Sequence, residues 1–81
     1  SLMREEGFLC FARYTAQDLA LVSLNRTDAP VTRQITLSPS LPQPSTSMLD
    51  ALRPSDPPVD IVSDSLTVTV PARAAVILLP N

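Results

Sequence analysis

The sequence predicts an all-β fold, a small antiparallel β-sandwich with Greek-key-like connections and roughly six to eight short strands. The first observation is a series of short apolar or alternating runs, separated by turn-forming Asn, Asp and Pro residues at spacings of about 8–12 residues. The second is that the most helix-like run, Leu19–Asn25, lacks a 3.6-residue apolar period. The third is the composition: with 81 residues, 44% apolar and 17% charged, the chain makes one globular domain.

Three strands are expected in the first half of the chain, at Phe8–Tyr14, Leu19–Asn25 and Val31–Leu37. The first is rich in aromatic residues. The loop before the third, Asn25–Pro30, holds Asn and Asp, which tolerate left-handed backbone. The third strand alternates, which is typical of a strand with one solvated face. Its core-facing set is Val31, Arg33, Ile35 and Leu37, and its solvated set is Thr32, Gln34 and Thr36.

The second half begins with a surface crossover at Ser38–Ser47, because its prolines cannot donate to a strand ladder. Met48–Leu52 is predicted to be a short strand or a single turn against the core, and Val59–Val62 another short strand. Leu66–Val70 alternates most clearly, with its leucine and valines inward and its threonines outward. The last strand is expected at Ala74–Leu79, where either face is acceptable as the core face.

Two of these strands, Leu19–Asn25 and Ala74–Leu79, are apolar at nearly every position. Strands that are apolar on both faces are usually covered on both faces. In the first of the two, one alternate set is wholly apolar and the other contains two polar residues. The apolar set, expected in the core, is Ala20, Val22 and Leu24, and the opposite set is Leu19, Leu21, Ser23 and Asn25. We therefore expect Leu19 and Leu21 to contact another domain; the alternative is that they are scattered exposed leucines.

The composition excludes most kinds of reactive site. The chain has no histidine, which excludes a Ser–His or Cys–His nucleophile pair and a zinc site. Its one cysteine, Cys10, lies inside an apolar strand and is expected to be a buried structural thiol. All six cations are arginines spread singly along the chain, without the basic cluster of a nucleic-acid binder. We expect no catalytic, cofactor-binding or metal-binding residue, and no nucleic-acid partner.

The remaining polar groups are predicted to form turns. Asp56, Asp60 and Asp64 lack the glycine and paired ligands of a calcium loop, so we expect solvated turn carboxylates. Asn25 with Asp28 has the residue types of a binding pair, but turn formation explains both more simply. No apolar run approaches the roughly 20 residues needed to span a bilayer, so no membrane partner is expected.

Sugar binding depends on exposed aromatic side chains, on which a pyranose ring stacks its C–H face. The chain has no tryptophan, and Tyr14 is its one tyrosine. Tyr14 shares a strand face with Phe8 and Cys10, so core packing is favoured over a sugar-binding platform. A starch- or maltodextrin-binding module with Tyr14 as its platform is the second hypothesis.

The order of the segments resembles a known domain. An aromatic strand (Phe8–Tyr14) precedes an apolar strand that closes on an Asn-Arg-Thr-Asp loop (Leu19–Asp28), and later come a Leu-Asp-Ala-Leu tetrad (Leu49–Leu52) and a Leu-Thr-Val-Thr-Val-Pro run (Leu66–Pro71). From Gly7 onward this order is similar to the C-terminal β-sandwich domain of α-amylase-type glycoside hydrolases, in particular the bacterial cyclomaltodextrinase, neopullulanase and maltogenic amylase branch. The tetrad lacks the glycine that often completes its turn in that family.

The resemblance implies a non-catalytic C-terminal domain at residues 7–81, with residues 1–6 as a tail or linker from the preceding domain. In that family a (β/α)₈ barrel supplies the Asp, Glu and second Asp of a retaining glycosidase, and none of those positions lies in this chain. The expected partner is the barrel of the same polypeptide, which the domain stabilises by packing on it.

By the same resemblance the parent enzyme acts on α-glucan, which is also a possible ligand of this domain. A bacterial cytoplasmic location is expected, since no signal peptide is visible. The alternatives are the carbohydrate-binding module and a free-standing β-sandwich for protein–protein contact.

Overall fold

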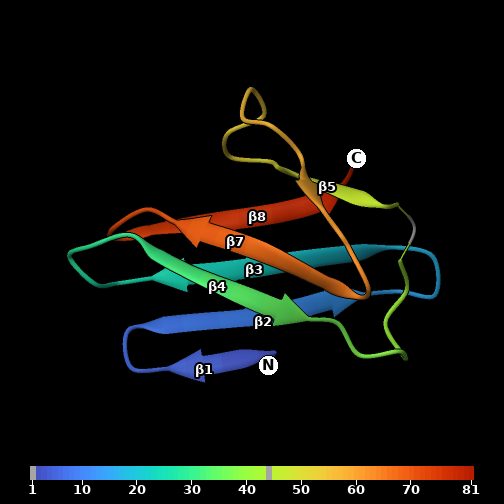
Figure 1. Ribbon diagram of the computed structural model, residues 1–81, viewed down its shortest axis with the longest axis horizontal. Helices are drawn as coiled ribbons and strands as arrows, with labels where there is room; N and C mark the ends of the chain where they lie inside the picture. Colours follow the sequence, from blue (N-terminus) through green and yellow to red (C-terminus); the bar gives the residue numbers. More distant parts are fainter. Residues whose placement is uncertain (1, 44) are drawn as a thin grey trace.

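The computed structural model describes residues 2–43 and 45–81, so Ser1 of the expected tail and Pro44 of the expected crossover lie outside the described residues. The described chain folds into eight strands without a helix, and every strand pairing is antiparallel (Figure 1). This confirms the predicted all-β class. Among the described residues, no helix is long and apolar enough to cross a membrane. The strands are β1 (Met3–Glu5), β2 (Phe8–Tyr14), β3 (Leu19–Asn25), β4 (Val31–Thr36), β5 (Ser47–Asp50), β6 (Val59–Asp60), β7 (Ser65–Val70) and β8 (Ala74–Pro80).

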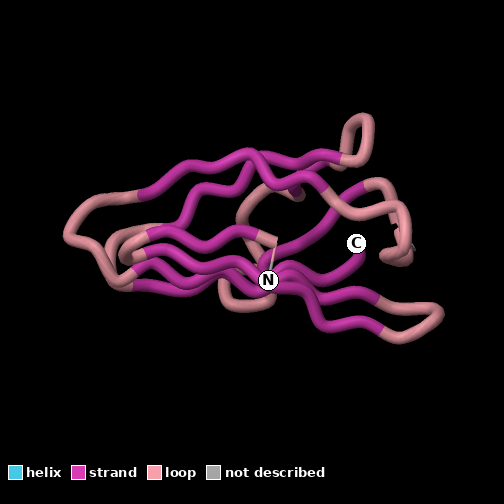
Figure 2. Tube along the Cα trace, turned by 90° about the horizontal axis from the view of Figure 1, so that it is seen from below, coloured by secondary structure: helices cyan, strands magenta, loops and turns pink. Residues whose placement is uncertain are grey.

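The strands form two layers of unequal size. Six strands make the larger sheet, in the order β1-β2-β3-β8-β5-β6, and β4 pairs with β7 in a two-stranded sheet. Figure 2 shows the two layers edge on, and in Figure 1 β4 and β7 lie in front of the larger sheet. The chain changes layer between β3 and β4, between β4 and β5, and on both sides of β7. Such crossings are those of a Greek-key-like sandwich.

The facing sides of the two sheets form the hydrophobic core. On β7 the leucine and valines are buried and the threonines between them are exposed, as predicted. On the β4 side Ile35 and Leu37 are buried, and the intervening polar side chains are exposed. The larger sheet adds a matching set of buried apolar side chains: Phe8, Cys10, Leu19, Leu21, Met48, Val76 and Leu78. Because strand side chains alternate, every second residue of the larger sheet lies on its far side.

The core side of β3 is the reverse of the predicted one. Leu19 and Leu21 are each 1% exposed and pack in the domain's own core, whereas Leu24 is 42% exposed. The prediction treated Ser23 and Asn25 as solvent-facing, but both are buried, because Asn25 finds hydrogen-bond partners on the other sheet. Leu19 and Leu21 therefore have no exposed surface with which to contact another domain. The sequence left open which face of the last strand packs in the core. In the structure Val76 and Leu78 face the core.

Asn25 ties the end of β3 to the end of β7 in the other sheet. Its Nδ2 donates to the backbone carbonyls of Ala29 (2.9 Å), Val70 (3.1 Å) and Pro71 (3.1 Å). Its Oδ1 accepts from the backbone N–H (2.9 Å) and the hydroxyl (2.7 Å) of Thr27. A buried amide with this set of partners is fully satisfied. The prediction that Asn25 serves a turn is confirmed.

Asp50 holds the turn that follows β5. Its Oδ1 accepts from the backbone N–H groups of Leu52 (3.0 Å) and Ile77 (3.2 Å), and its Oδ2 accepts from the Arg53 guanidinium (2.8 Å). Burial by itself raises the pKa of Asp50, but the hydrogen bonds and the charge of Arg53 outweigh burial, so this pKa lies below its ordinary value. The Leu-Asp-Ala-Leu tetrad thus forms its turn without a following glycine.

Residues 2–6 differ from the expected tail or linker. Met3–Glu5 forms β1, which pairs with β2 and makes an edge of the larger sheet. Gly7 forms the turn between them with φ of +80°, in a region that glycine enters without strain. Arg33 of β4 donates to both carboxylate oxygens of Glu5 (2.8 and 3.0 Å), so an exposed ion pair links the layers at this edge. The folded domain therefore begins earlier than residue 7.

Candidate functional site

The far side of the larger sheet, here named the outer face, consists of apolar side chains on four adjacent strands. Strand alternation places there the residues that lie between the core residues of β2, β3, β8 and β5. The sheet register aligns them in rows, such as Leu9 beside Leu24 beside Ala75, and Phe11 beside Val22 beside Ile77. The outer face comprises Leu9, Phe11, Ala20, Val22, Leu24, Leu49, Ala75, Ile77 and Leu79.

The exposure of these side chains is unusual for a sandwich. Leu24 is 42% and Leu79 41% exposed, and the others are half-buried. The outward side of the two-stranded sheet is polar by contrast, with Thr32 paired to Thr69 and Gln34 to Thr67. Soluble monomers rarely expose a large contiguous apolar patch, and such patches mark interaction sites. The outer face is therefore the main candidate site of this domain.

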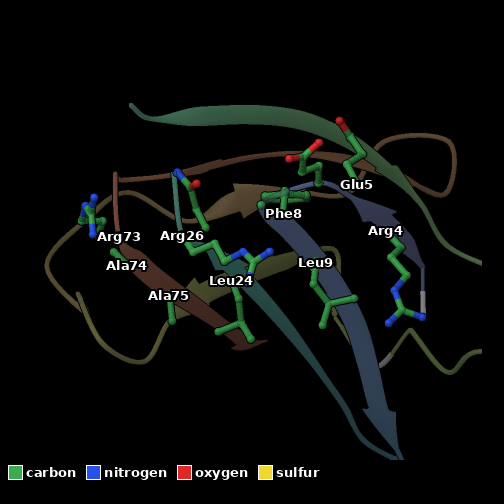
Figure 3. A pocket seen from close by; sticks show the side chains of 12 residues that line it. Arg4, Glu5, Phe8, Leu9, Leu24, Arg26, Arg73, Ala74 and Ala75 are labelled. Carbon is green, nitrogen blue, oxygen red and sulfur yellow. The ribbon is translucent and has the colours of Figure 1, made fainter. Parts of the chain in front are cut away.

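A depression of about 740 Å³ lies at one end of the outer face, beside the turn between β1 and β2 (Figure 3). The side chains of Leu9, Leu24 and Ala75 point to the same side there, one from each of three adjacent strands. Arg4 of β1 points to this side as well, and the side chain of Arg26 extends beside Leu24. The depression is also lined by Arg73, Glu5 and Glu6, so it combines an apolar floor with three cationic and two acidic side chains.

The six arginines of the chain fall into two groups. Three form ion pairs within the domain: Arg33 with Glu5, Arg53 with Asp50, and Arg73 with Asp28. The other three, Arg4, Arg13 and Arg26, are exposed and form no ion pair with any residue that the structure describes. All three border the outer face. Arg4 is aligned with Leu9 and Arg13 with Ala20, and Arg26 follows the outward Leu24 by two positions.

Tyr14 is exposed, which contradicts the prediction that it packs in the core. Its exposed fraction is 59%, and it is the last residue of β2, next to the hairpin turn. One depression of about 370 Å³ lies between Tyr14, Thr15 and Ser40. Another, of about 290 Å³, lies between Tyr14, Arg13 and Asp18. The one tyrosine is thus accessible to a ligand.

Reactive chemistry is not favoured anywhere in the described chain. Cys10 is 0% exposed, as predicted, and burial raises the pKa of its thiol, so the nucleophilic thiolate is disfavoured. The hydroxyl of Ser23 is buried and has no hydrogen-bond partner among the described residues. Within residues 2–43 and 45–81, no three or more His, Cys, Asp or Glu side chains gather closely enough to hold a metal ion. The described residues thus show a buried thiol and no cluster of metal-ligating side chains.

Sequence reasoning identified the unusual strand but assigned its two sides the wrong way round. It placed Leu19 and Leu21 at an interface, whereas the interface candidates are the residues between and after them. One signal points to the correct side. The spacing of Asn25 and Thr27 is that of an Asx turn, in which the Asn side chain bonds to the backbone two residues on and has less need of water.

The comparisons with known proteins give a likeness in structure but none in sequence. No protein-family model and no curated protein matches the sequence. Among solved structures, the chain is similar to part of a GH30 endoxylanase from Clostridium papyrosolvens C71, with a TM-score of 0.77 and 15% sequence identity. The match covers 100% of this chain and 22% of the endoxylanase chain. The fold of this domain thus occurs as a part of a glycoside hydrolase, although that enzyme is an endoxylanase and not the α-amylase type.

Proposed function

We propose that this chain is a non-catalytic accessory domain of a glycoside hydrolase, and that it stabilises the catalytic domain by packing its outer face on it. The observation that supports this most is the apolar surface across β2, β3, β8 and β5, which an isolated domain leaves in water. The fold likeness adds support, since the matching fold occupies only 22% of an endoxylanase chain.

The size of the sheet suits such an interface. The molecule measures 35 × 27 × 21 Å, and the view down its shortest axis looks onto the broad side of the sheets (Figure 1). A stable protein interface buries roughly 800 Å² on each partner, and the outer face occupies part of this 35 × 27 Å side. Removal of its apolar surface from water contributes about 25 cal/mol per Å² before the costs of association, which favours contact with a neighbouring domain.

The substrate class of the parent enzyme is the finer part of the proposal. The order of sequence segments favours an α-amylase-type parent that acts on α-glucan, and the fold likeness favours a parent of the endoxylanase kind. We propose the second, because the likeness extends over the whole chain in three dimensions, whereas the first depends on short segments. The coding sequence adjoining this chain distinguishes the two, since it encodes the catalytic domain in either case.

The substitution Val22→Asp tests the packing. Val22 lies in the middle of the row Phe11–Val22–Ile77. In the isolated domain the new carboxylate remains hydrated, so we expect a loss of about 1 kcal/mol in unfolding free energy. Against a neighbouring domain the same carboxylate is buried without a partner, which costs roughly 3–5 kcal/mol. The melting temperature of the parent enzyme should therefore fall much more than that of the isolated domain.

Two control variants show how a charge in the core and a charge on a polar surface affect stability. Leu21→Asp places a charge in the core and should unfold both the isolated domain and the domain in the parent, because Leu21 is 1% exposed. Thr67→Asp, on the polar outward side of β7, should affect neither. If Val22→Asp lowers the stability of the two forms equally, the outer face is not the packing surface.

Carbohydrate binding is the second candidate function, and the exposure of Tyr14 favours it. A ring that is 59% exposed and flanked by hydroxyl-bearing Thr15 and Ser40 has the elements of a sugar-stacking site. The site lacks a second aromatic ring. Phe8 lies on the core side of β2 and Phe11 on its outer side, and neither lines the depressions beside Tyr14. We therefore place it second.

A further inference from the structure

The outer face carries a charge pattern in addition to its apolar surface. Arg4, Arg13 and Arg26 border it and have no ion-pair partner among the described residues. The other three arginines are all paired, including Arg73, which lines the larger depression and is paired with Asp28. Three acidic residues line a depression with these arginines: Glu5 and Glu6 with Arg4 and Arg26, and Asp18 with Arg13. Glu5 is paired with Arg33, and Glu6 and Asp18 form no ion pair within this part of the chain.

Arginine at such positions is suited to carboxylate recognition. The guanidinium group presents a planar fork of N–H donors that matches the two oxygens of a carboxylate. Arginine is also enriched in protein interfaces, where its long stem packs on apolar side chains while its charged end reaches the rim. In Figure 3 the stem of Arg26 lies beside Leu24 in this manner.

We propose that the surface docked on the outer face carries carboxylates opposite Arg4, Arg13 and Arg26, arranged around an apolar centre. This inference rests on the proposed function, and its occupant is the catalytic domain of the same parent. A second copy of this chain fits less well, because its outer face presents the same three arginines and offers Glu6 and Asp18 as the acids that line these depressions without an ion pair in the described chain.

The sheet register fixes the spacing of these carboxylates. Arg4 is aligned with Leu9, and Arg13 lies four residues further along β2. With a rise of about 3.3 Å per residue, the two ends of this edge are about 13 Å apart. Arg26 lies with Arg4 at the end with the larger depression. The partner surface therefore needs one acidic group or pair at that end and another about 13 Å away, near the β2–β3 hairpin.

The test uses the intact parent enzyme and the 81-residue chain side by side. The single variants Arg4→Gln, Arg13→Gln and Arg26→Gln and the triple variant are compared by melting temperature at low and high salt. Each single change should lower the melting temperature of the parent by about 1–3 °C and the triple change by several degrees. High salt should remove most of the difference, and the isolated chain should show no comparable loss.

Arg33→Gln is the control, because it removes the same charge from β4 of the two-stranded sheet, away from the outer face; since it also breaks the pair with Glu5, its loss should be equal in the parent and in the isolated chain. Val22→Asp in the same parent separates the two proposals. If Val22→Asp destabilises the parent selectively and the triple arginine variant does not, the packing stands and the carboxylate inference is overturned. Equal losses for the triple variant in the parent and in the isolated chain also overturn it.

If the adjoining coding sequence contains no glycoside hydrolase domain, the proposed function is refuted and the charge inference falls with it. If it contains one, the arginine variants decide the charge inference by themselves. In a charge-swap experiment, Arg13→Glu should destabilise the parent, and replacement of the facing carboxylate by lysine should restore the melting temperature. Absence of rescue from every acidic position near the hairpin would contradict the assigned pairing.

Discussion

Replacement of Asn25 by alanine removes the side chain that joins the two sheets at one end of the domain. The amide donates to three backbone carbonyls, at distances of 2.9, 3.1 and 3.1 Å, and its oxygen accepts two hydrogen bonds from Thr27. The bond to Val70 is buried and spans 45 residues of sequence. The variant therefore leaves polar backbone groups without partners at a place that water does not reach freely.

The expected loss follows from these contacts. A hydrogen bond contributes about 1 kcal/mol net to stability, and a buried group left without its partner costs about 1–3 kcal/mol. The Val70 carbonyl is buried and would be left without a partner, whereas the partly buried carbonyls of Ala29 and Pro71 can form hydrogen bonds to water instead. We expect Asn25→Ala to lower the unfolding free energy by about 3–4 kcal/mol. A domain of 81 residues has roughly 4–12 kcal/mol in total, so this is a large share.

Urea denaturation of the isolated domain, followed by circular dichroism, measures this loss. Gln34→Ala is the control, because Gln34 is an exposed amide on β4 and its loss should change stability by less than about 0.5 kcal/mol. Asn25→Asp retains an acceptor for Thr27 but removes both donors, so it should lose at least as much as the alanine variant. A loss below about 1 kcal/mol for Asn25→Ala would refute the reasoning that this amide ties the sheets together.

Two further predictions concern acid stability and sugar binding. The folded-state pKa of Asp50 lies below the ordinary value of 3.8, so its stabilising contribution is complete above that value and is lost as the pH falls through the folded-state pKa. Asp50→Asn should cost about 1–2 kcal/mol at neutral pH and should flatten this part of the pH profile of unfolding; an unchanged profile would contradict the assignment. If the domain binds sugar, Tyr14→Ala should abolish retardation in affinity gels that contain soluble xylan or starch, whereas Leu52→Ala, at a site 53% exposed, should not. Equal mobility of the unsubstituted domain with and without polysaccharide removes this candidate.

Several elements follow from the sequence because their signal is local. In Leu66–Val70 and Val31–Leu37 polar and apolar residues alternate, and the structure places the predicted apolar residues in the core. In such strands the alternation alone predicts which face turns to the core, because only one of the two faces carries the apolar side chains. The burial of Cys10 follows from its apolar neighbours in the same way. The strand at Met3–Glu5 was missed because three residues between charged side chains give no comparable pattern.

The orientation of β3 and β8 does not follow from local pattern, because both sides of these strands are apolar. Leu19 and Leu21 lie in the core on the same side as Asn25, whose amide donates to the carbonyls of Val70 and Pro71. Those carbonyls are 45 and 46 residues away in sequence, so the local sequence around β3 gives no sign of these hydrogen bonds. The prediction that Leu19 and Leu21 face outward is therefore wrong, and the outward side of β3 is that of Ala20, Val22 and Leu24.

By itself the sequence determined the all-β class, most strand positions, the absence of histidine chemistry and the presence of surplus apolar surface, because composition and a two-residue period are local properties. Only the tertiary structure decided where that surplus lies. The strand order β2-β3-β8-β5 aligns apolar residues from distant segments into one outer face and sets Arg4, Arg13 and Arg26 around it. Such an arrangement depends on strand pairing between segments more than 50 residues apart, as in Leu24 beside Ala75. Long-range contacts establish this pairing, and the local conformational preferences of the residues do not.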